Sequence, residues 1–472
     1  MGSLFSALTS AGQSLKAFEQ AIEVTQNNVA NANSPGYADQ VPQLISQDFL
    51  SNTHSTAGGV AEVTDDTRNA YADTAVRQQL SLQGMYQQLQ TTLAPLQNVF
   101  DVSANSAIPG ALNQLFQSFS AWASQPNNAD FQNSVIDAAQ QTATAFQQAS
   151  LQLNQIQTST TNDIQSTVAQ INQDAAQIQA LNQQIAKNST PNAGLQAQLE
   201  SALENLSGQA NIQVLRGIGG TATVLLGGQT ALVEGLQMTP IQAANDPASN
   251  AGNPGAAPNV IIQDASGKDI TSEITGGSLA GLLNVRNKLI PSLIGGGQQV
   301  GGLNTLAQGL ADSVNNILTQ AVTPAGQPGT ALFTYNASAP AGIAGSLNVA
   351  AGITGSALAA ATTGANAVAN GAALTLAALD STSPGPVNGQ GFTQYFATLA
   401  ASVGNAVNNA TNQASAQSSL VAQAKSLQQQ VSGVSLDEEA IRLVQLQSAY
   451  QAASKVVTVI NEMTQSLLAI TI

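Results

Sequence analysis

Cysteine is absent from this 472-residue chain, and histidine occurs only once, at His54. The absence of cysteine excludes a disulfide framework, a thiolate metal site and a cysteine nucleophile. A zinc site with several histidine or cysteine ligands is excluded as well, and a Ser-His-Asp triad would have to use His54. Because His54 lies in the polar segment 51–56, we predict a loop residue there and no metal site in the chain.

Charged and aromatic residues are scarce, at 8% and 4% of the chain, and the net charge is −15. Nucleic acids and anionic membranes are bound by clustered Lys and Arg, whereas the eleven basic residues here are scattered from Lys16 to Lys455. Long hydrophobic runs are also missing, since Gly, Ser, Thr and Asn interrupt the uncharged stretch 313–379. We therefore expect neither nucleic acid nor a membrane as a partner. The first residues also lack the basic and apolar regions of a cleaved secretory signal.

Two rows of large apolar residues, one at each chain end, are the strongest pattern that is present. With small residues between them, their members follow alternating spacings of four and three, which is typical of a coiled coil. We predict that the two terminal helices pair and that the pair forms an assembly seam. The residues of this predicted seam are Leu4, Leu8, Leu15, Phe18, Ile22, Val29, Leu443, Leu446, Tyr450, Val457, Ile460 and Leu467.

Local signals predict where the two terminal helices end and begin. Pro35 and Gly36 stand in the order that a type II turn requires, so the first helix should stop before them. Near the other end, Ser435 and Glu438 have the spacing of a capping box, which predicts the start of the last helix.

The same turn and cap segments carry a family resemblance. Segments 27–37 and 433–463 resemble the N-terminal and C-terminal signatures of flagellar rod, hook and hook-associated proteins. Segment 276–283 with Arg286, together with the helical stretch 110–206, is similar to the hook-associated members that join the hook to the filament. The motif residues are Asn27, Asn28, Asn31, Pro35, Gly36, Tyr37, Glu438, Glu439, Ala449, Tyr450 and Gln451.

The resemblance implies a non-enzymatic structural subunit of the bacterial flagellum that joins hook to filament and self-assembles through its paired terminal helices. Such a subunit would be secreted by the flagellar type III export apparatus and would reach the hook–filament junction outside the cell, where motility depends on it. The implied partners are further copies in a ring, the hook protein, hook-associated protein 3, and a cytosolic export chaperone on the C-terminal helix.

Two alternatives remain open. A flagellar hook or distal-rod protein would carry the same terminal signatures, although such proteins usually lack the long helical stretch 110–206. A remote alternative is a carboxylate hydrolase on the β-rich insert, which would need two acids in one cleft. Asp65 and Asp66 are adjacent, but a single pair of this kind is typical of a solvated turn.

The periodicity along the chain predicts an α+β fold that is predominantly α, with an elongated helical bundle and outer β-rich parts. Apolar residues at helical spacing predict helices over 67–100, 112–187, 279–318 and 392–431, and β-branched residues around 217–220 predict a hairpin. We divide the chain into a terminal coiled-coil core domain (1–50 and 431–472), a helical rod-like domain (51–210, 276–320 and 391–430), a small β-rich element (211–275) and an outer Gly/Ala-rich β domain (321–390).

Three further features are interpreted as structural rather than as sites. The glycines of 217–220 resemble a dinucleotide loop, but no helix follows that could receive a phosphate. Segment 264–269 lacks the ligand spacing and the terminal Glu of a calcium loop. Phe119 and Trp122 share a helical face with apolar residues, which favours a core position over a binding hot spot. We predict no catalytic, cofactor-binding or metal-binding residue.

Overall fold

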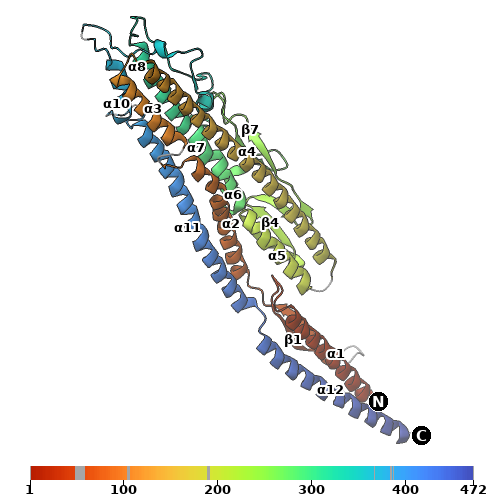
Figure 1. Cartoon of the computed structure of the whole chain (residues 1–472). Helices are drawn as coiled ribbons and strands as arrows, with labels where there is room; N and C mark the ends of the chain where they lie inside the picture. The colour runs from red at the N-terminus through yellow and green to blue at the C-terminus, as the bar shows by residue number, and fades with distance from the viewer. Residues whose placement is uncertain are drawn as a thin grey trace.

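The computed structural model describes residues 2–47, 59–103, 107–188, 192–365, 367–382, 385 and 387–470. They form an elongated helical rod with both chain ends at one extremity (Figure 1). The helices are α1 (Gly2–Asn31), α2 (Ala70–Val99), α3 (Ala107–Ser124), α4 (Ala129–Lys187), α5 (Ala193–Gln209), α6 (Gly277–Asn284), α7 (Ile290–Ile294), α8 (Gly302–Thr319), α9 (Ile343–Ser346), α10 (Gly371–Ala378), α11 (Phe392–Ser432) and α12 (Leu436–Ile470).

The strands form small antiparallel sheets beside the helices. β1 and β2 pair as a hairpin in which Gln40 lies opposite Asp66, and a four-stranded sheet has the order β3-β4-β5-β6. β7 pairs with β8, and β9 pairs with β10. The strands are β1 (Gln40–Gln47), β2 (Gly59–Asp66), β3 (Ile212–Arg216), β4 (Ala222–Leu226), β5 (Thr230–Glu234), β6 (Gln237–Met238), β7 (Gln242–Asp246), β8 (Asn259–Gln263), β9 (Phe333–Thr334) and β10 (Asn348–Val349).

The rod is organised around α4, a helix of 59 residues. Asn128 caps its N-terminus, because the Asn128 side chain accepts a hydrogen bond from the backbone N–H of Asp130. The C-terminal half of α4 carries an apolar stripe that is buried in one core with residues of α5, α6 and the β3–β6 sheet. The members of this stripe are Ile164, Val168, Ile171, Ala175, Ile178, Leu181 and Ile185.

A second hydrophobic core joins the N-terminal half of α4 to α3, α8 and α11. Phe119 and Trp122 are completely buried in it, which confirms their predicted core positions. The rings of Phe116 and Phe392 stack with centroids 5.8 Å apart and connect α3 with α11. The indole N–H of Trp122 donates to the carbonyl of Pro126 at 3.1 Å, so its polar atom is satisfied inside the core.

The predominantly α fold predicted from the sequence is confirmed, as are the helices predicted over 67–100, 112–187, 279–318 and 392–431. The stretch 279–318 is interrupted where α7 ends, because Gly295 adopts a φ of 87°, a conformation that glycine accommodates. The predicted hairpin is formed by β3 and β4, with Val214 opposite Val224. Within the described ranges, no helix combines the length and the apolar character needed to cross a bilayer.

The segment 321–390 differs from its predicted β-rich character. The strands among its described residues are the two-residue β9 and β10, and the other elements are the helices α9 and α10 and three short 3-10 helices. Ala373 and Leu376 are buried where α10 packs against α3, and alanine favours helix more strongly than strand. The prediction of a β domain was wrong here because Gly/Ala-rich composition does not distinguish strands from short helices and loops.

Candidate functional site: the paired chain ends and their joint

The two terminal helices lie antiparallel and in contact beyond the end of the bundle, which confirms the predicted pairing of the chain ends (Figure 1). Helix α12 begins after Ser435, whose hydroxyl accepts a hydrogen bond from the backbone N–H of Glu438 at 3.5 Å, as the capping box predicts. Of the predicted seam residues of α12, Leu446 and Ile460 are buried. Leu443 and Val457 are half-buried, and Tyr450 and Leu467 are exposed.

The fully buried face of α1 differs from the predicted seam, because its members are small or polar: Ala17, Ala21, Thr25 and Asn28. Small residues let α12 and the β1–β2 hairpin approach the backbone of α1 closely, so the larger side chains project along the edge of the contact. The half-buried members of the predicted seam are Leu4, Leu8, Leu15, Phe18 and Ile22. Val29, which the spacing places in the seam, is 44% exposed.

Asn28 is the centre of a polar cluster that ties the two chain ends together. Its side-chain amide donates to the carboxylates of Asp39 at 2.6 Å and Glu439 at 3.0 Å, and to the backbone carbonyl of Gln40 at 2.8 Å. Its carbonyl oxygen accepts from the Tyr37 hydroxyl at 3.0 Å and from the Gln40 N–H at 3.1 Å. One buried side chain therefore connects α1, the turn that follows it, β1 and the start of α12.

Burial and neighbouring carboxylates shift the pKa values in this cluster. Burial, followed by Asp39, Asp66 and Glu439, raises the pKa of Tyr37 to about 12. Burial and then Glu439 raise the pKa of Asp39, against a lowering effect of Arg442, which pairs with Glu439 and lies 4.0 Å from Asp39. Tyr37 therefore stays protonated at neutral pH, as the hydrogen bond that it donates requires.

The turn after α1 is the predicted type II turn, since the Tyr37 N–H donates to the Ser34 carbonyl at 3.2 Å and Gly36 has a φ of 73°. A Cβ on Gly36 would lie 2.5 Å from the carbonyl oxygen of Ala197, so α5 packs directly on this glycine. The structure brings into one cluster the motif residues Asn28, Tyr37 and Glu439. The motif residues that stay exposed or half-buried outside it are Asn27, Asn31, Pro35, Glu438, Ala449, Tyr450 and Gln451.

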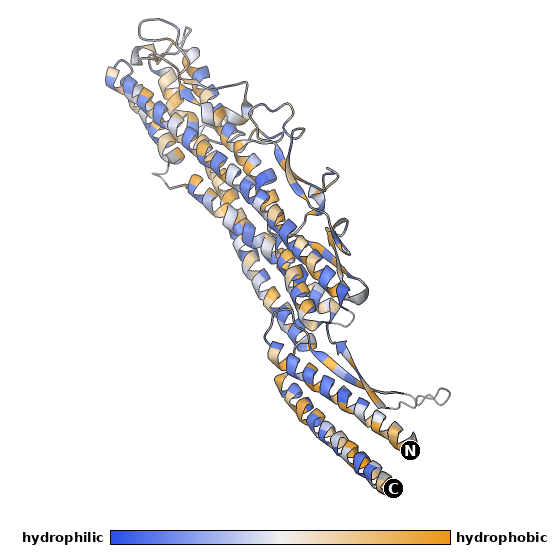
Figure 2. Cartoon of the chain, turned by 90° about the vertical axis from the view of Figure 1, so that its right-hand side faces the viewer, coloured by the Kyte–Doolittle hydropathy of each residue, from blue (hydrophilic) through white to orange (hydrophobic). Residues whose placement is uncertain are grey.

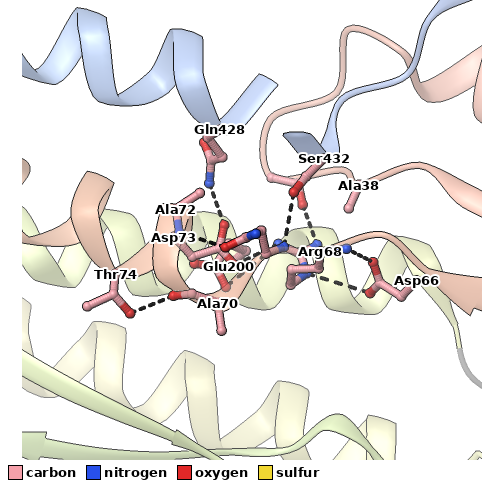
Figure 3. A network of polar contacts seen from close by, with 12 residues as sticks. Ala38, Asp66, Arg68, Ala70, Ala72, Asp73, Thr74, Glu200, Gln428 and Ser432 are labelled. Atoms are coloured by element: carbon pink, nitrogen blue, oxygen red, sulfur yellow. Dashed lines mark hydrogen bonds and ion pairs between the residues drawn. The ribbon is translucent and has the colours of Figure 1, made fainter. Parts of the chain in front are cut away.

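Helices α1 and α12 together are called the terminal pair, and the place where this pair meets the helical bundle is called the joint. A second polar cluster lies at the joint and holds the terminal pair against the bundle (Figure 3). Arg68, which follows β2, donates to the Gly36 carbonyl at 2.8 Å. The Arg68 guanidinium also lies 3.7 Å from the carboxylate of Asp73 on α2 and 3.8 Å from that of Glu200 on α5. This arginine therefore contacts the terminal turn and two helices of the bundle.

Ser432 connects the two places where the chain passes between the bundle and the terminal pair. Its hydroxyl accepts from the Asn69 N–H at 3.0 Å, and its carbonyl accepts from the Asp39 N–H at 2.9 Å. One turn earlier on α11, the Gln428 amide donates to the Asp73 carboxylate at 2.7 Å (Figure 3). The passage from β2 to α2 and the passage from α11 to α12 are thereby hydrogen-bonded to each other.

Glu200 is fully buried at this joint and is surrounded by arginines. Arg77 and Arg216 each donate a hydrogen bond to a different oxygen of its carboxylate, and Arg68 lies beside it. Burial raises the pKa of Glu200 while the arginines lower it, and burial lowers the pKa of Arg216. Three of the five arginines of the chain thus converge on one carboxylate.

A cavity of about 580 Å³ opens beside the joint and is lined in part by Asp66, Arg68, Asp73, Arg77 and Arg216. These charges pair with one another or with the buried carboxylate on α5. The paired charges suit a joint between structural elements, because compensated buried charges fix geometry rather than attract a further ion.

The acid pair considered for hydrolysis is divided between the two faces of β2. Asp65 accepts a hydrogen bond from Gln43, whereas Asp66 pairs with Arg68 on the other side of the strand. Two carboxylates that point in opposite directions cannot act on one bond, so this pair does not support the hydrolase alternative.

The remaining candidate segments form turns. Asp264 closes its own turn by accepting from the N–H groups of Ser266 and Lys268. The glycines of 217–220 form the turn between β3 and β4. Among the residues that the structure describes, no group of three or more His, Cys, Asp or Glu side chains is arranged to hold a metal. The predicted loop residue His54 lies outside the described residues.

Several residues of the two clusters are not predicted by the sequence. The sequence does contain one signal for a buried ion pair at Glu200. This residue lies three positions before Leu203 on the buried face of α5, where a carboxylate requires a partner. The partners themselves have no local signal, since Arg77 is 123 positions away from Glu200. The cluster residues without a sequence prediction are Asp39, Gln40, Arg68, Asp73, Arg77, Glu200, Arg216, Ser432 and Arg442.

Fold and site together define a class of protein, an elongated helical structural subunit whose two chain ends pair beyond its rod. A family model described as the flagellar hook-associated protein FlgK helical domain matches residues 93–333, about half of the chain. A second model, the C-terminal region of flagellar basal body rod FlgEFG proteins, matches residues 427–470. The chain belongs to the FlgK family of flagellar hook-associated proteins.

Individual relatives agree with this assignment. Flagellar hook-associated protein 1 of Bacillus subtilis (strain 168) is 27% identical over 505 residues, which cover 98% of this chain and 97% of the relative. The protein of the same name in Salmonella typhimurium is 25% identical over 342 residues, covering 70% of this chain and 59% of that protein. The solved structure of the flagellar hook junction protein FlgK from Burkholderia pseudomallei shares the fold, with a TM-score of 0.64 at 18% identity over 75% of this chain and 99% of that one.

These matches confirm the function predicted from the sequence, a structural subunit of the bacterial flagellum that joins hook to filament. They favour it over a hook or distal-rod protein, because the matched helical domain spans the long stretch that distinguishes the hook-associated members. The family is a structural one, and its members assemble with other components of the flagellum.

Proposed function

We propose that this chain acts at the hook–filament junction by self-assembling through α1 and α12, and that it catalyses no reaction. The observation that carries the proposal is the pairing of both chain ends beyond one end of the bundle. Copies that associate through such an end can form a common core and leave their bundles at the periphery. The Asn28 and Glu200 clusters support this role, because they fix the direction of the terminal pair relative to the bundle.

The proposed assembly surface consists of the predicted seam and the motif cluster. Leu446 and Ile460 would hold α12 to α1 within one copy, since they are buried in that contact. Half-buried residues such as Leu8, Leu15 and Ile22 would contact neighbouring subunits, because part of their apolar surface remains exposed.

We propose a ring of copies with the hook protein on one side and hook-associated protein 3 on the other. The subunit would leave the cell through the flagellar type III export apparatus. A cytosolic chaperone would cover α12 beforehand. Support for this last partner comes from the exposed apolar residues of α12, since surfaces of this kind promote aggregation unless they are covered.

Deletion of the gene in its host tests the proposal. We expect hooks without filaments and flagellin released into the medium, and we expect the full chain to restore filaments. A matched control is a chain that ends at residue 434, before α12, which should not restore them. Normal filaments in the deletion strain would contradict the proposed function.

A second candidate, a hook or distal-rod protein, is favoured by one observation, the match of residues 427–470 to the C-terminal region of rod proteins. The same deletion separates the two. Loss of the hook itself would indicate a hook or rod protein, whereas intact hooks that lack filaments would indicate the junction subunit.

A further inference from the structure

Helix α12 carries a second row of large apolar residues, which faces solvent. The exposed fractions of its members run from 51% to 62%. At about 100° per residue they fall within roughly a third of the helix circumference, which also contains the small Ser448 and Ala452 and the polar Gln445 and Lys455. The members of this outer row are Ile441, Val444, Val456, Val459 and Met463.

The outer row is distinct from the face that α12 turns toward α1. Leu446 and Ile460, which are buried in the contact with α1, lie roughly 130° and 90° around the helix from the middle of the outer row, and Val456 is the row member nearest to them. The bundle does not cover it either, because the terminal pair extends beyond the bundle and shows hydrophobic residues along both helices (Figure 2). Single exposed apolar residues are ordinary, but five large ones on one third of a helix mark an interaction surface.

Helix α1 carries a complementary row that opens on the other side of the terminal pair. Gln20 and Val24 of α1 line a cavity with residues of β2, so the hairpin lies against that face of α1. Leu8, Leu15 and Ile22 lie on the opposite face, about half a turn away. Because α1 and α12 are antiparallel right-handed helices, the hairpin and the outer row lie on one side of their common plane. The row on α1 opens on the other side.

We propose that the outer row of one copy packs against Leu8, Leu15 and Ile22 of a second copy in the flagellum. The two surfaces differ and lie on opposite sides, so the contact is heterologous and each copy keeps a surface of each kind for its next neighbour. A contact between two outer rows would instead end at a dimer and leave the row on α1 uncovered. The helices also match in length, with 30 residues in α1 and 35 in α12.

The absence of cysteine allows a direct test, because an introduced cysteine has no competing thiol in the chain. The deletion host would express two variants together, a tagged copy with Val456→Cys and an untagged copy with Leu8→Cys, Leu15→Cys or Ile22→Cys in turn. A disulfide between the two can then form only between copies. The matched control replaces Val456→Cys by Thr458→Cys, which lies two residues further along α12, exposed and outside both apolar faces.

We expect mixed disulfide dimers with Val456→Cys for at least one position on α1, at about tenfold or more the yield of the Thr458→Cys control. Dimers of Val456→Cys with itself, or equal yields with the control, in strains that carry filaments would overturn the proposed packing.

The inference rests on the proposed self-assembly, and the filaments of the same strains report on that separately. If the unaltered chain does not restore filaments to the deletion host, the proposed function is contradicted. If filaments form but the expected disulfide does not, only the proposed packing is contradicted.

Discussion

At the scale of single residues, the few charges of this chain are concentrated where its parts meet. The carboxylate of Glu200 is fully buried, and its oxygens are occupied by Arg77 and Arg216. Arg68 extends the same cluster to the turn after α1. A buried ion pair contributes little net stability as a whole, but removal of one partner leaves the other charges uncompensated. The cluster therefore gives the joint a defined geometry, and removal of the Glu200 carboxylate should destabilise the folded protein.

Replacing Glu200→Gln should lower the free energy of unfolding by about 3–5 kcal/mol, because the buried arginines would lose their counter-charge. Chemical denaturation of the full chain measures the change. Glu204→Gln is the matched control four residues away on α5, since Glu204 pairs at 3.1 Å with the partly exposed Lys425 and should cost only about 0–1 kcal/mol. An equal decrease in the free energy of unfolding for the two variants would show that the buried cluster contributes no more to stability than the exposed ion pair.

Asp39 provides a prediction about pH. Its pKa in the folded protein is raised, by burial and then by Glu439, so the folded state binds a proton more tightly than the unfolded chain does. Stability contributed by this group is therefore gained as the pH falls through the folded pKa and is lost above it. Asp39→Asn keeps an oxygen that can accept from Asn28 and removes the repulsion with Glu439.

We therefore expect Asp39→Asn to be more stable than the unaltered chain at about pH 7, and the difference to shrink toward about pH 4. Hydrogen exchange over residues 28–40 at the two pH values measures it. A difference that grows on acidification would mean that the pairing of Asp39 with Arg442 outweighs its burial.

At the scale of elements, the sequence predicts the secondary structure that depends on neighbouring residues. It does not predict features that depend on contacts between segments far apart in the chain. The helical spacing of α2, α4 and α11 is visible in the chain itself. The buried face of α1 is not, because it depends on a hairpin whose first strand, β1, contains Pro42 and has no clear strand signal. The Glu200 cluster is hidden for the same reason, since its members come from α2, α5 and β3.

Ile460→Asp should disrupt the contact between α12 and α1. Ile460 is 9% exposed and faces α1, so the new carboxylate would be buried without a partner, which costs several kcal/mol. We expect a soluble protein with an intact bundle that no longer supports filament attachment, measured by complementation of the deletion strain. Gln465→Asp, on an exposed position of the same helix, is the control. Normal attachment with Ile460→Asp would refute the assignment of Ile460 to the seam.

At the scale of the whole molecule, the rod and the terminal pair are unequally supported. The rod buries large apolar side chains in two extended cores around α4. The terminal pair buries chiefly small or polar residues of α1, together with Leu446 and Ile460 of α12. Full burial of one such large side chain stabilises by about 1.5–3 kcal/mol, whereas ordering each residue of the backbone costs about 1–2 kcal/mol. The terminal pair should consequently open far more readily than the rod.

We predict that residues 5–30 and 440–465 exchange their amide hydrogens rapidly in the isolated monomer and become protected on assembly. Neighbouring copies would cover the outer row of α12 and the half-buried row of α1, and this adds the apolar burial that a single copy lacks. Hydrogen exchange on dilute monomer and on assembled flagella measures both states, with the buried stripe of α4 as the internal reference. Protection of the two terminal segments in dilute monomer as strong as that of α4 would show that assembly is not what stabilises them. Their covering surface would then have to be the hairpin and the joint rather than a neighbouring copy.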